Sequence, residues 1–81
     1  MNIEEIRESY PEVALMDGYD DCIVGVICGA GIQSKVCYST EKVICKLMDG
    51  GMMYDDALEY HDFNQVGAYV DEHTPCFLQD L

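Results

Sequence analysis

The chain has 81 residues, of which 16 are acidic and only four are Lys or Arg, so its formal net charge at pH 7 is −12. This length predicts a single domain, residues 1–81, with a thin hydrophobic core. So acidic a surface repels nucleic acid and anionic membranes, and we expect direct binding to neither. It attracts basic patches on other proteins, although acidic surfaces also serve solubility alone.

The N-terminal ten residues lack the basic and apolar regions of a signal peptide, and no stretch approaches the roughly 20 apolar residues that span a bilayer. The five cysteines are odd in number and contain no C-x-x-C pair, so they predict neither a disulfide framework nor a zinc site. We therefore expect a cytoplasmic protein whose cysteines are small, buried hydrophobic residues. An oligomeric interface is then the expected support for the thin core.

The first half of the chain predicts a helix and a hairpin. Residues 2–9 favour a short helix that Pro11 closes. Residues 22–28 are apolar on both strand faces and rich in β-branched side chains, which predicts a buried strand. A glycine-rich turn leads to a second strand at 32–38. Because the first strand is apolar on both faces, a second copy of the chain is expected to cover one of them, in a homodimer.

The second half predicts two helices and a short strand. The first helix is capped by Ser39 or Thr40 and stops at a double glycine. The second runs from about 54 to 66, and an extended piece at 68–70 precedes an edge strand at 76–78. The predicted fold is α+β, with a small antiparallel sheet, made of the hairpin and the short C-terminal strand, packed against two or three helices.

The second helix has two distinct faces. Its inner face is predicted to carry Met53, Ala57, Tyr60, His61 and Asn64. The opposite face carries an acidic stripe of Asp55, Glu59 and Asp62. A cation site or an acid/base pair would be the catalytic interpretation of this stripe, but it lacks both the E-x-x-H pairing and the glycine-centred calcium spacing. A solvated helix face is the simpler interpretation.

Little else in the chain suggests catalysis. His73 and Cys76 have an H-x-x-C spacing, which a metal or a Cys–His nucleophile would use, but no second cluster accompanies them. A turn histidine beside a buried cysteine is the alternative. The glycines at 29–31 make no dinucleotide fingerprint. We expect no catalytic residues, no metal and no cofactor, and hence no enzyme.

Tyrosine and methionine are abundant, with six and five residues. Tyrosine is favoured at binding surfaces because it combines a large contact area with a polar tip. Met48, Met52 and Met53 flank the double glycine, where they would form either an adaptable apolar patch or part of the core.

The segment LMDGGMMYDDALEYHDFNQVGAYVDEHTP, with YP and the run DGYDDCIVGV upstream of it, resembles a family of small bacteriophage-encoded proteins. The family pattern is approximately D-G-M-S-x-x-x-A-x-E-Y-x-x-F-N-x-x-G-A-Y-V-G-E-x-T-P-x-F. With one extra residue, Gly50, between its first two positions, it falls here on Asp49, Gly51, Met52, Ala57, Glu59, Tyr60, Phe63, Asn64, Gly67, Ala68, Tyr69, Val70, Glu72, Thr74, Pro75 and Phe77. With the upstream run, the likeness covers about residues 10–78. Two departures are Met53, where the family has a capping Ser, and Asp71, where it has Gly.

The resemblance implies a phage origin and brings no catalytic residues with it. Small acidic phage proteins often inhibit host defence, and the nearest functional parallel is an inhibitor of the BREX restriction system. The predicted function is therefore non-enzymatic inhibition of a bacterial antiphage defence system such as BREX, in the cytoplasm of the infected host. The residues expected to bind a host defence protein are Asp55, Asp56, Glu59, Asp62, Tyr69, Asp71 and Glu72.

Two alternatives stay open. Asp55 and Glu59 lie about 6 Å apart along a helix axis, close to the spacing of phosphates along a DNA strand, which suggests a strict DNA mimic that competes with nucleic acid for a DNA-binding protein. The other alternative is a small structural or regulatory subunit of the phage.

Overall fold

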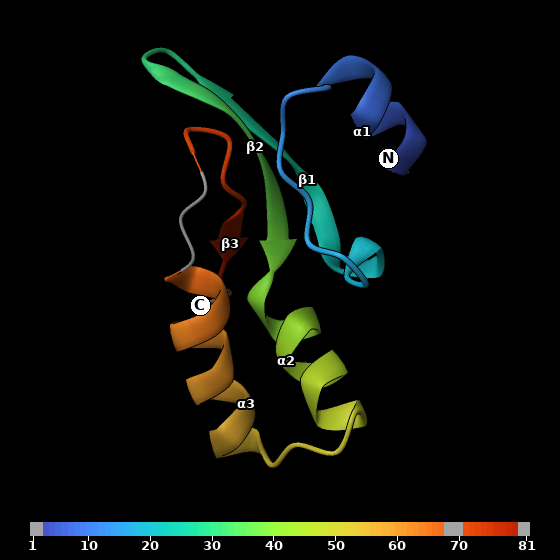
Figure 1. Ribbon diagram of the computed structural model, residues 1–81, viewed down its shortest axis with the longest axis vertical. Helices are drawn as coiled ribbons and strands as arrows, with labels where there is room; N and C mark the ends of the chain where they lie inside the picture. Colours follow the sequence, from blue (N-terminus) through green and yellow to red (C-terminus); the bar gives the residue numbers. More distant parts are fainter. Residues whose placement is uncertain (1–2, 68–70, 80–81) are drawn as a thin grey trace.

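The computed structural model describes residues 3–67 and 71–79, and Figure 1 shows their arrangement. The expected α+β class is confirmed, since the chain combines three helices with a three-stranded sheet. In chain order the elements are α1 (Ile3–Ser9), the 3-10 turn η1 (Asp20–Cys22), β1 (Ile23–Gly29), β2 (Ile32–Ser39), α2 (Thr40–Asp49), α3 (Tyr54–His61), the π-helical turn η2 (Asp62–Val66) and β3 (Cys76–Leu78).

The hairpin of β1 and β2 forms as predicted. The two strands pair antiparallel, with Val26 opposite Val36 and Gly29 opposite Ile32 at the turn. Gly31 has a φ of +80°, in the left-handed region that favours glycine, which explains why the turn needs this residue. The register shifts between Ile23 and Gly25, so a bulge bends β1 near its start.

The third strand corrects the prediction of an antiparallel sheet. The strand order is β1-β2-β3, and β3 runs parallel to β2, with Cys76 opposite Cys37 and Phe77 opposite Tyr38. The cause is the helical pair between them: α2 leads the chain away from the end of β2 and α3 leads it back (Figure 1). The chain therefore enters β3 from the same end as β2, and the sheet is mixed.

The burial predicted for residues 22–28 is wrong for most of that segment. Cys22 is only 2% exposed, but Val24 and Ile27 in β1 are 47% and 40% exposed, and Cys28 is exposed too. The physical reason is position, because β2 occupies the centre of the sheet and β1 forms an edge. Cys45 is also exposed and Cys76 is only partly buried, so the expectation of buried cysteines holds for Cys22 and Cys37 but not for the other three.

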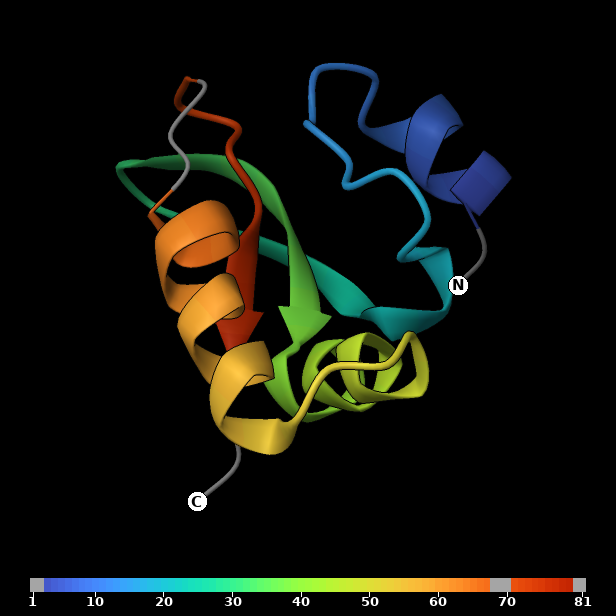
Figure 2. The same cartoon turned by 60° about the horizontal axis from the view of Figure 1, so that its bottom comes forward.

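The core lies between β2 and the N-terminal part of the chain. Its fully buried members are Ile6, Cys22, Val36, Tyr38 and Val43. Figure 2 shows α1 and the segment that follows it on one side of the hairpin, with α3 across the molecule beside β3. The segment between α1 and η1 is attached to the core through the backbone N–H of Met16, which donates to the Tyr38 hydroxyl at 2.7 Å.

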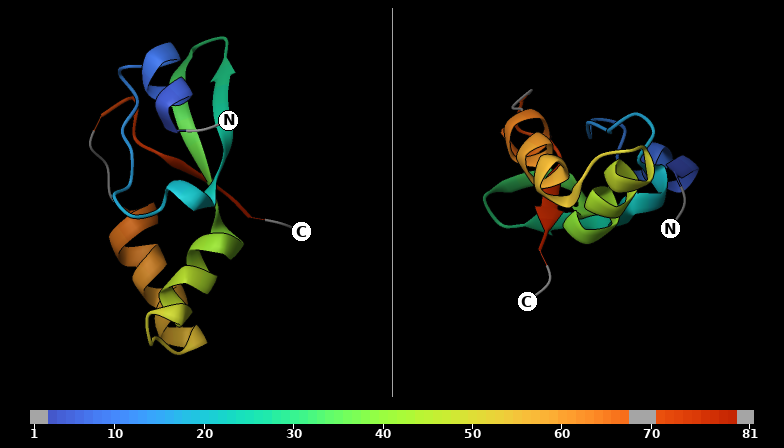
Figure 3. Two further views of the ribbon diagram at one scale, coloured as in Figure 1. Left: turned by 90° about the vertical axis from the view of Figure 1, so that its right-hand side faces the viewer. Right: turned by 90° about the horizontal axis from the view of Figure 1, so that it is seen from below.

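The helical pair lies beyond the end of the sheet rather than flat on one face of it, as the left panel of Figure 3 shows. Ser39 is the N-cap of α2, since its hydroxyl accepts from the backbone N–H of Lys42 at 3.2 Å. Lys46 joins α2 to η1 through a 2.7 Å ion pair with Asp21, and this ammonium group holds the pKa of that carboxyl below its usual range.

In the part of the chain that the structure describes, no helix has the length and apolar character needed to cross a membrane.

Candidate acidic interaction surface

Four of the predicted partner-binding residues gather on α3 and η2. Asp55, Asp56, Glu59 and Asp62 are all exposed, and they are called the acidic surface from here on. Asp55 and Asp56 stand in the first turn of α3, where the helix dipole stabilises negative charge. Met53, at the N-cap position, makes no side-chain hydrogen bond to the start of the helix. The interaction of the two carboxylates with the helix dipole partly compensates for it.

The charge of the acidic surface is not neutralised within residues 3–67 and 71–79. Among those residues, Lys46 of α2 pairs with Asp21 of η1, and this ion pair involves none of the four carboxylates. No Lys or Arg occurs in the sequence after Lys46. The carboxylates on α3 therefore present uncompensated negative potential to solvent, which attracts a basic partner and raises its rate of association.

Two further predicted residues, Asp71 and Glu72, do not extend this surface. Asp71 and Glu72 are exposed, but they belong to a turn beside the hairpin, where the His73 ring Nδ1 lies 3.0 Å from the carbonyl oxygen of Ser34. The Asp71 carboxylate accepts from the backbone N–H of His73 at 2.7 Å, so it is used in building the turn. Tyr69 lies outside the described residues.

The inner face of α3 is narrower than predicted. Ala57 and His61 are buried, whereas Met53 is 73% and Tyr60 38% exposed. The His61 ring packs edge-on against Phe77, with ring centroids 4.7 Å apart, and this contact holds α3 against β3. Its Nδ1 lies 2.6 Å from the Gln65 side-chain oxygen, as expected for a buried, hydrogen-bonded histidine. Its Nε2 is buried without a partner in the described structure.

Phe63 is the member of this surface that sequence reasoning missed. Its side chain is 78% exposed, the largest exposed fraction among the exposed large hydrophobic residues. A shallow depression brings it together with Asp56, Glu59 and Tyr60. The signal was present in the spacing, because Phe63 follows Glu59 by four residues and Asp56 by seven, which places it on the polar side of the helix.

The helix continues past His61 as a π-helical turn. In η2 the backbone N–H of Gly67 donates to the carbonyl oxygen of Asp62, five residues earlier, at 3.2 Å. Such turns rotate the side chains that they carry relative to a regular helix and are often found at functional sites. Here the turn carries Asp62 and Phe63, one charged and one aromatic member of the exposed surface.

The cluster suggested by the H-x-x-C spacing does not form a metal centre in the described part of the chain. Within it, no group of three or more His, Cys, Asp or Glu side chains is arranged to hold a metal ion. His73 instead contacts the backbone of Ser34, while the thiol of Cys76 lies 3.7 Å from the carbonyl oxygen of Val36. Burial, together with the neighbouring Cys37, raises the pKa of the Cys76 thiol to about 11, which disfavours the reactive thiolate.

Comparisons of the chain with models of protein families, with curated proteins and with solved structures find no match. The resemblance to small phage proteins therefore stays a prediction from the sequence pattern.

Proposed function

We propose that this protein is a phage-encoded, non-enzymatic inhibitor of a bacterial antiphage defence system such as BREX. It binds a host defence protein in the cytoplasm of the infected cell through the acidic surface. The observation that carries the proposal is the exposed Phe63 among the uncompensated carboxylates of α3 and η2. Carboxylates steer a basic partner into contact, and an exposed aromatic ring gives that contact an apolar anchor.

The test is a pull-down of tagged protein from the lysate of a bacterium with an active BREX system, at low and at high salt. We expect one defence protein to be retained at low salt and lost at high salt, because salt screens exposed charges. Retention of phage proteins alone would favour a structural or regulatory phage subunit. Retention of nothing specific would contradict the proposal.

Charge variants locate the interface. The variant Asp55→Asn/Asp56→Asn/Glu59→Gln/Asp62→Asn is expected to lose at least about tenfold in affinity for the captured protein. Its matched control neutralises four exposed acids elsewhere: Glu8→Gln, Glu12→Gln, Asp17→Asn and Asp20→Asn. Both variants change the net charge equally, so equal losses of affinity would indicate a general charge effect rather than a specific surface.

Strict DNA mimicry is the second candidate. Asp55 and Glu59 are one helical turn apart on the same exposed face, which supports it through the phosphate-like spacing. A duplex of about 20 base pairs should then compete with the protein for the captured partner, and simultaneous binding would rule out mimicry. The Phe63→Ser variant separates the two candidates, because a phosphate mimic has no use for the ring, whereas an anchored interface loses affinity without it.

A further inference from the structure

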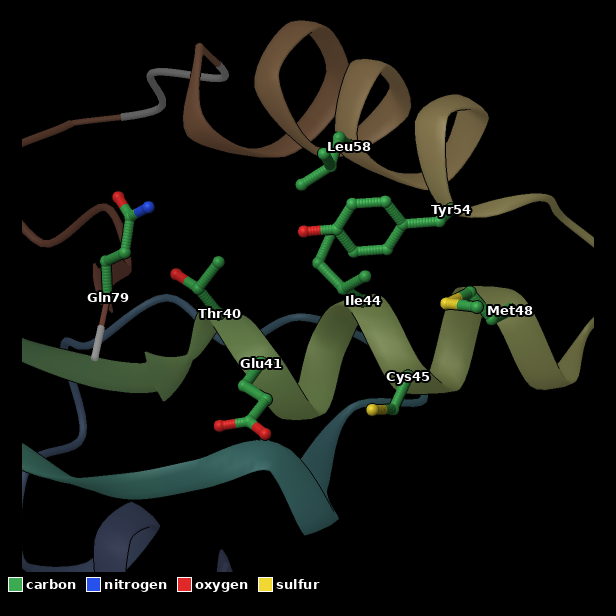
Figure 4. Close-up of a pocket in the computed structure, with 8 residues that line it drawn as sticks. All are labelled: Thr40, Glu41, Ile44, Cys45, Met48, Tyr54, Leu58 and Gln79. Atoms are coloured by element: carbon green, nitrogen blue, oxygen red, sulfur yellow. The ribbon is translucent and has the colours of Figure 1, made fainter. Parts of the chain in front are cut away.

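A groove between α2 and α3 carries apolar side chains that the fold leaves uncovered. Its volume is about 400 Å³, within the range of small-ligand and side-chain pockets. In Figure 4, Tyr54 and Leu58 extend from α3 toward α2, and Ile44 extends from α2 toward them. Met48 continues the α2 side of the groove near the loop that joins the two helices.

The lining is accessible rather than closed. Ile44 forms the buried floor at 5% exposed, whereas Met48, Tyr54 and Leu58 are 41%, 56% and 36% exposed. Water in contact with these walls gains few hydrogen bonds, so an apolar side chain that replaces it is favoured. Met48 adds adaptability, because an unbranched thioether fits side chains of different shape.

Acidic residues lie beside this apolar lining. Glu41 is one of the groove residues. On α3, Asp55 precedes Leu58 by three residues and Asp62 follows it by four, so both lie on the neighbouring turns of the same side of the helix. Lys42 and Lys46 of α2 are not among the groove residues. They line a neighbouring depression beside Asp21, which shares Glu41 and Cys45 with the groove.

The geometry points to this groove as the docking site for the apolar side chains of a Lys/Arg-bearing amphipathic helix of the partner. The inference rests on the proposed function and specifies the chemistry of what binds. Apolar side chains at helical spacing on the partner helix enter the groove, while Lys or Arg side chains on either side of them on that helix contact Asp55, Asp62 and Glu41. A second copy of this chain fits poorly, since a two-fold contact would bring each acidic rim against its own equivalent.

The experiment titrates ¹⁵N-labelled full-length protein with two synthetic helical peptides of equal length and charge, followed by NMR chemical shifts. One peptide combines Leu on one face with Lys on the other, and the second has Gln in place of each Leu. We expect the Leu/Lys peptide to bind roughly tenfold tighter, because only it fills the groove. Its shifts should centre on the backbone amides of Ile44, Met48, Tyr54 and Leu58.

Variants test the location. Met48→Gln/Leu58→Gln should remove the advantage of the Leu/Lys peptide, and Tyr54→Ala should reduce it independently. The matched control, Ile32→Gln/Val66→Gln, changes two residues that are 51% and 54% exposed and lie outside the groove, and should keep the advantage. All four changed side chains are partly exposed, so both double variants are expected to fold, which circular dichroism checks.

Three results would overturn the inference. Equal, salt-dependent affinity for both peptides would leave the acidic surface intact but remove the groove from the interface. Chemical-shift changes centred on Phe63 would show that the peptide's apolar side chains bind there instead of in the groove. A wild-type dimer that dissociates in Met48→Gln/Leu58→Gln would assign the groove to a second copy. Absence of salt-dependent binding by either peptide would count against the proposed function itself.

Discussion

The hydroxyl of Tyr38, at the centre of the sheet, accepts a hydrogen bond from the backbone N–H of Met16, 22 residues earlier, at 2.7 Å. Tyr38 is fully buried, and the segment that contains Met16 has no regular secondary structure of its own. One side-chain oxygen thus attaches an irregular stretch of backbone to the core. The same burial raises the pKa of the Tyr38 phenol.

We expect Tyr38→Phe to lower the free energy of unfolding by about 1–2 kcal/mol, because the N–H of Met16 loses its acceptor while the ring still fills the core. Urea denaturation measures the change. The control is Tyr54→Phe, which removes a hydroxyl from a ring that is 56% exposed and should change stability by less than about 0.5 kcal/mol. Equal effects of the two substitutions would contradict the role given to the buried hydroxyl.

Alkaline pH is expected to destabilise the protein through Cys76. Its pKa is raised to about 11 in the folded protein, from 9.0 for a free thiol. The folded state thus keeps its proton where the unfolded state has lost it, so stability is full below pH 9 and falls as the pH rises towards 11. Urea midpoints at pH 7, 9, 10 and 11, under reducing conditions, follow this loss.

Cys76→Ala should flatten that pH dependence, and Cys45→Ala, at an exposed position, should leave it unchanged. Some dependence persists in Cys76→Ala, because burial also raises the pKa values of Cys22 and Tyr38. The same slope in the wild type and in Cys76→Ala would show that the Cys76 thiol is not a source of the effect.

Ser39→Ala is expected to cost about 1 kcal/mol of stability, since the Lys42 N–H at the start of α2 loses its acceptor. Thermal unfolding measures the change as a lower Tm. Thr40→Ala is the control, because the sequence allowed either residue as the cap and the structure places Ser39 there. A larger loss in Thr40→Ala would reverse that assignment.

The homodimer stays a prediction, and the structure suggests where to test it. Val24 and Leu78 are 47% and 49% exposed and border the same depression at the end of the sheet next to α2. We expect Val24→Gln/Leu78→Gln to shift the protein from dimer to monomer in sedimentation velocity at micromolar concentration. Ile32→Gln, at the tip of the hairpin, should leave the dimer intact. A wild-type protein that is monomeric at every concentration would refute the prediction.

Local signals predicted most elements of the fold. Three boundaries are each set by a residue with a restricted or unusual backbone preference: Gly31 in the hairpin turn, Gly51 (φ +112°) just after the end of α2, and Pro75 before β3. The burial of Ala57 and His61 followed from helical periodicity.

Errors arose where long-range position decides the outcome. Apolar composition cannot distinguish a central strand from an edge strand, so the exposure of Val24 and Ile27 was missed. The direction of β3 depends on how α2 and α3 return the chain, which no local pattern records. For the candidate site, periodicity placed Asp55, Glu59 and Asp62 together, but the turn built by Asp71 depends on its contact with the hairpin.

The parallel pairing of β3 has a consequence for the order of folding. Cys76 pairs with Cys37, and α2 and α3 lie between these two residues in the sequence. This contact therefore closes a long loop, at a high cost in chain entropy. The hairpin and α2 depend on nearby residues and can form earlier, even while the C-terminus is still being synthesised. Until β3 arrives, β2 is an open edge that other chains can pair with, so β3 protects the newly made protein against aggregation.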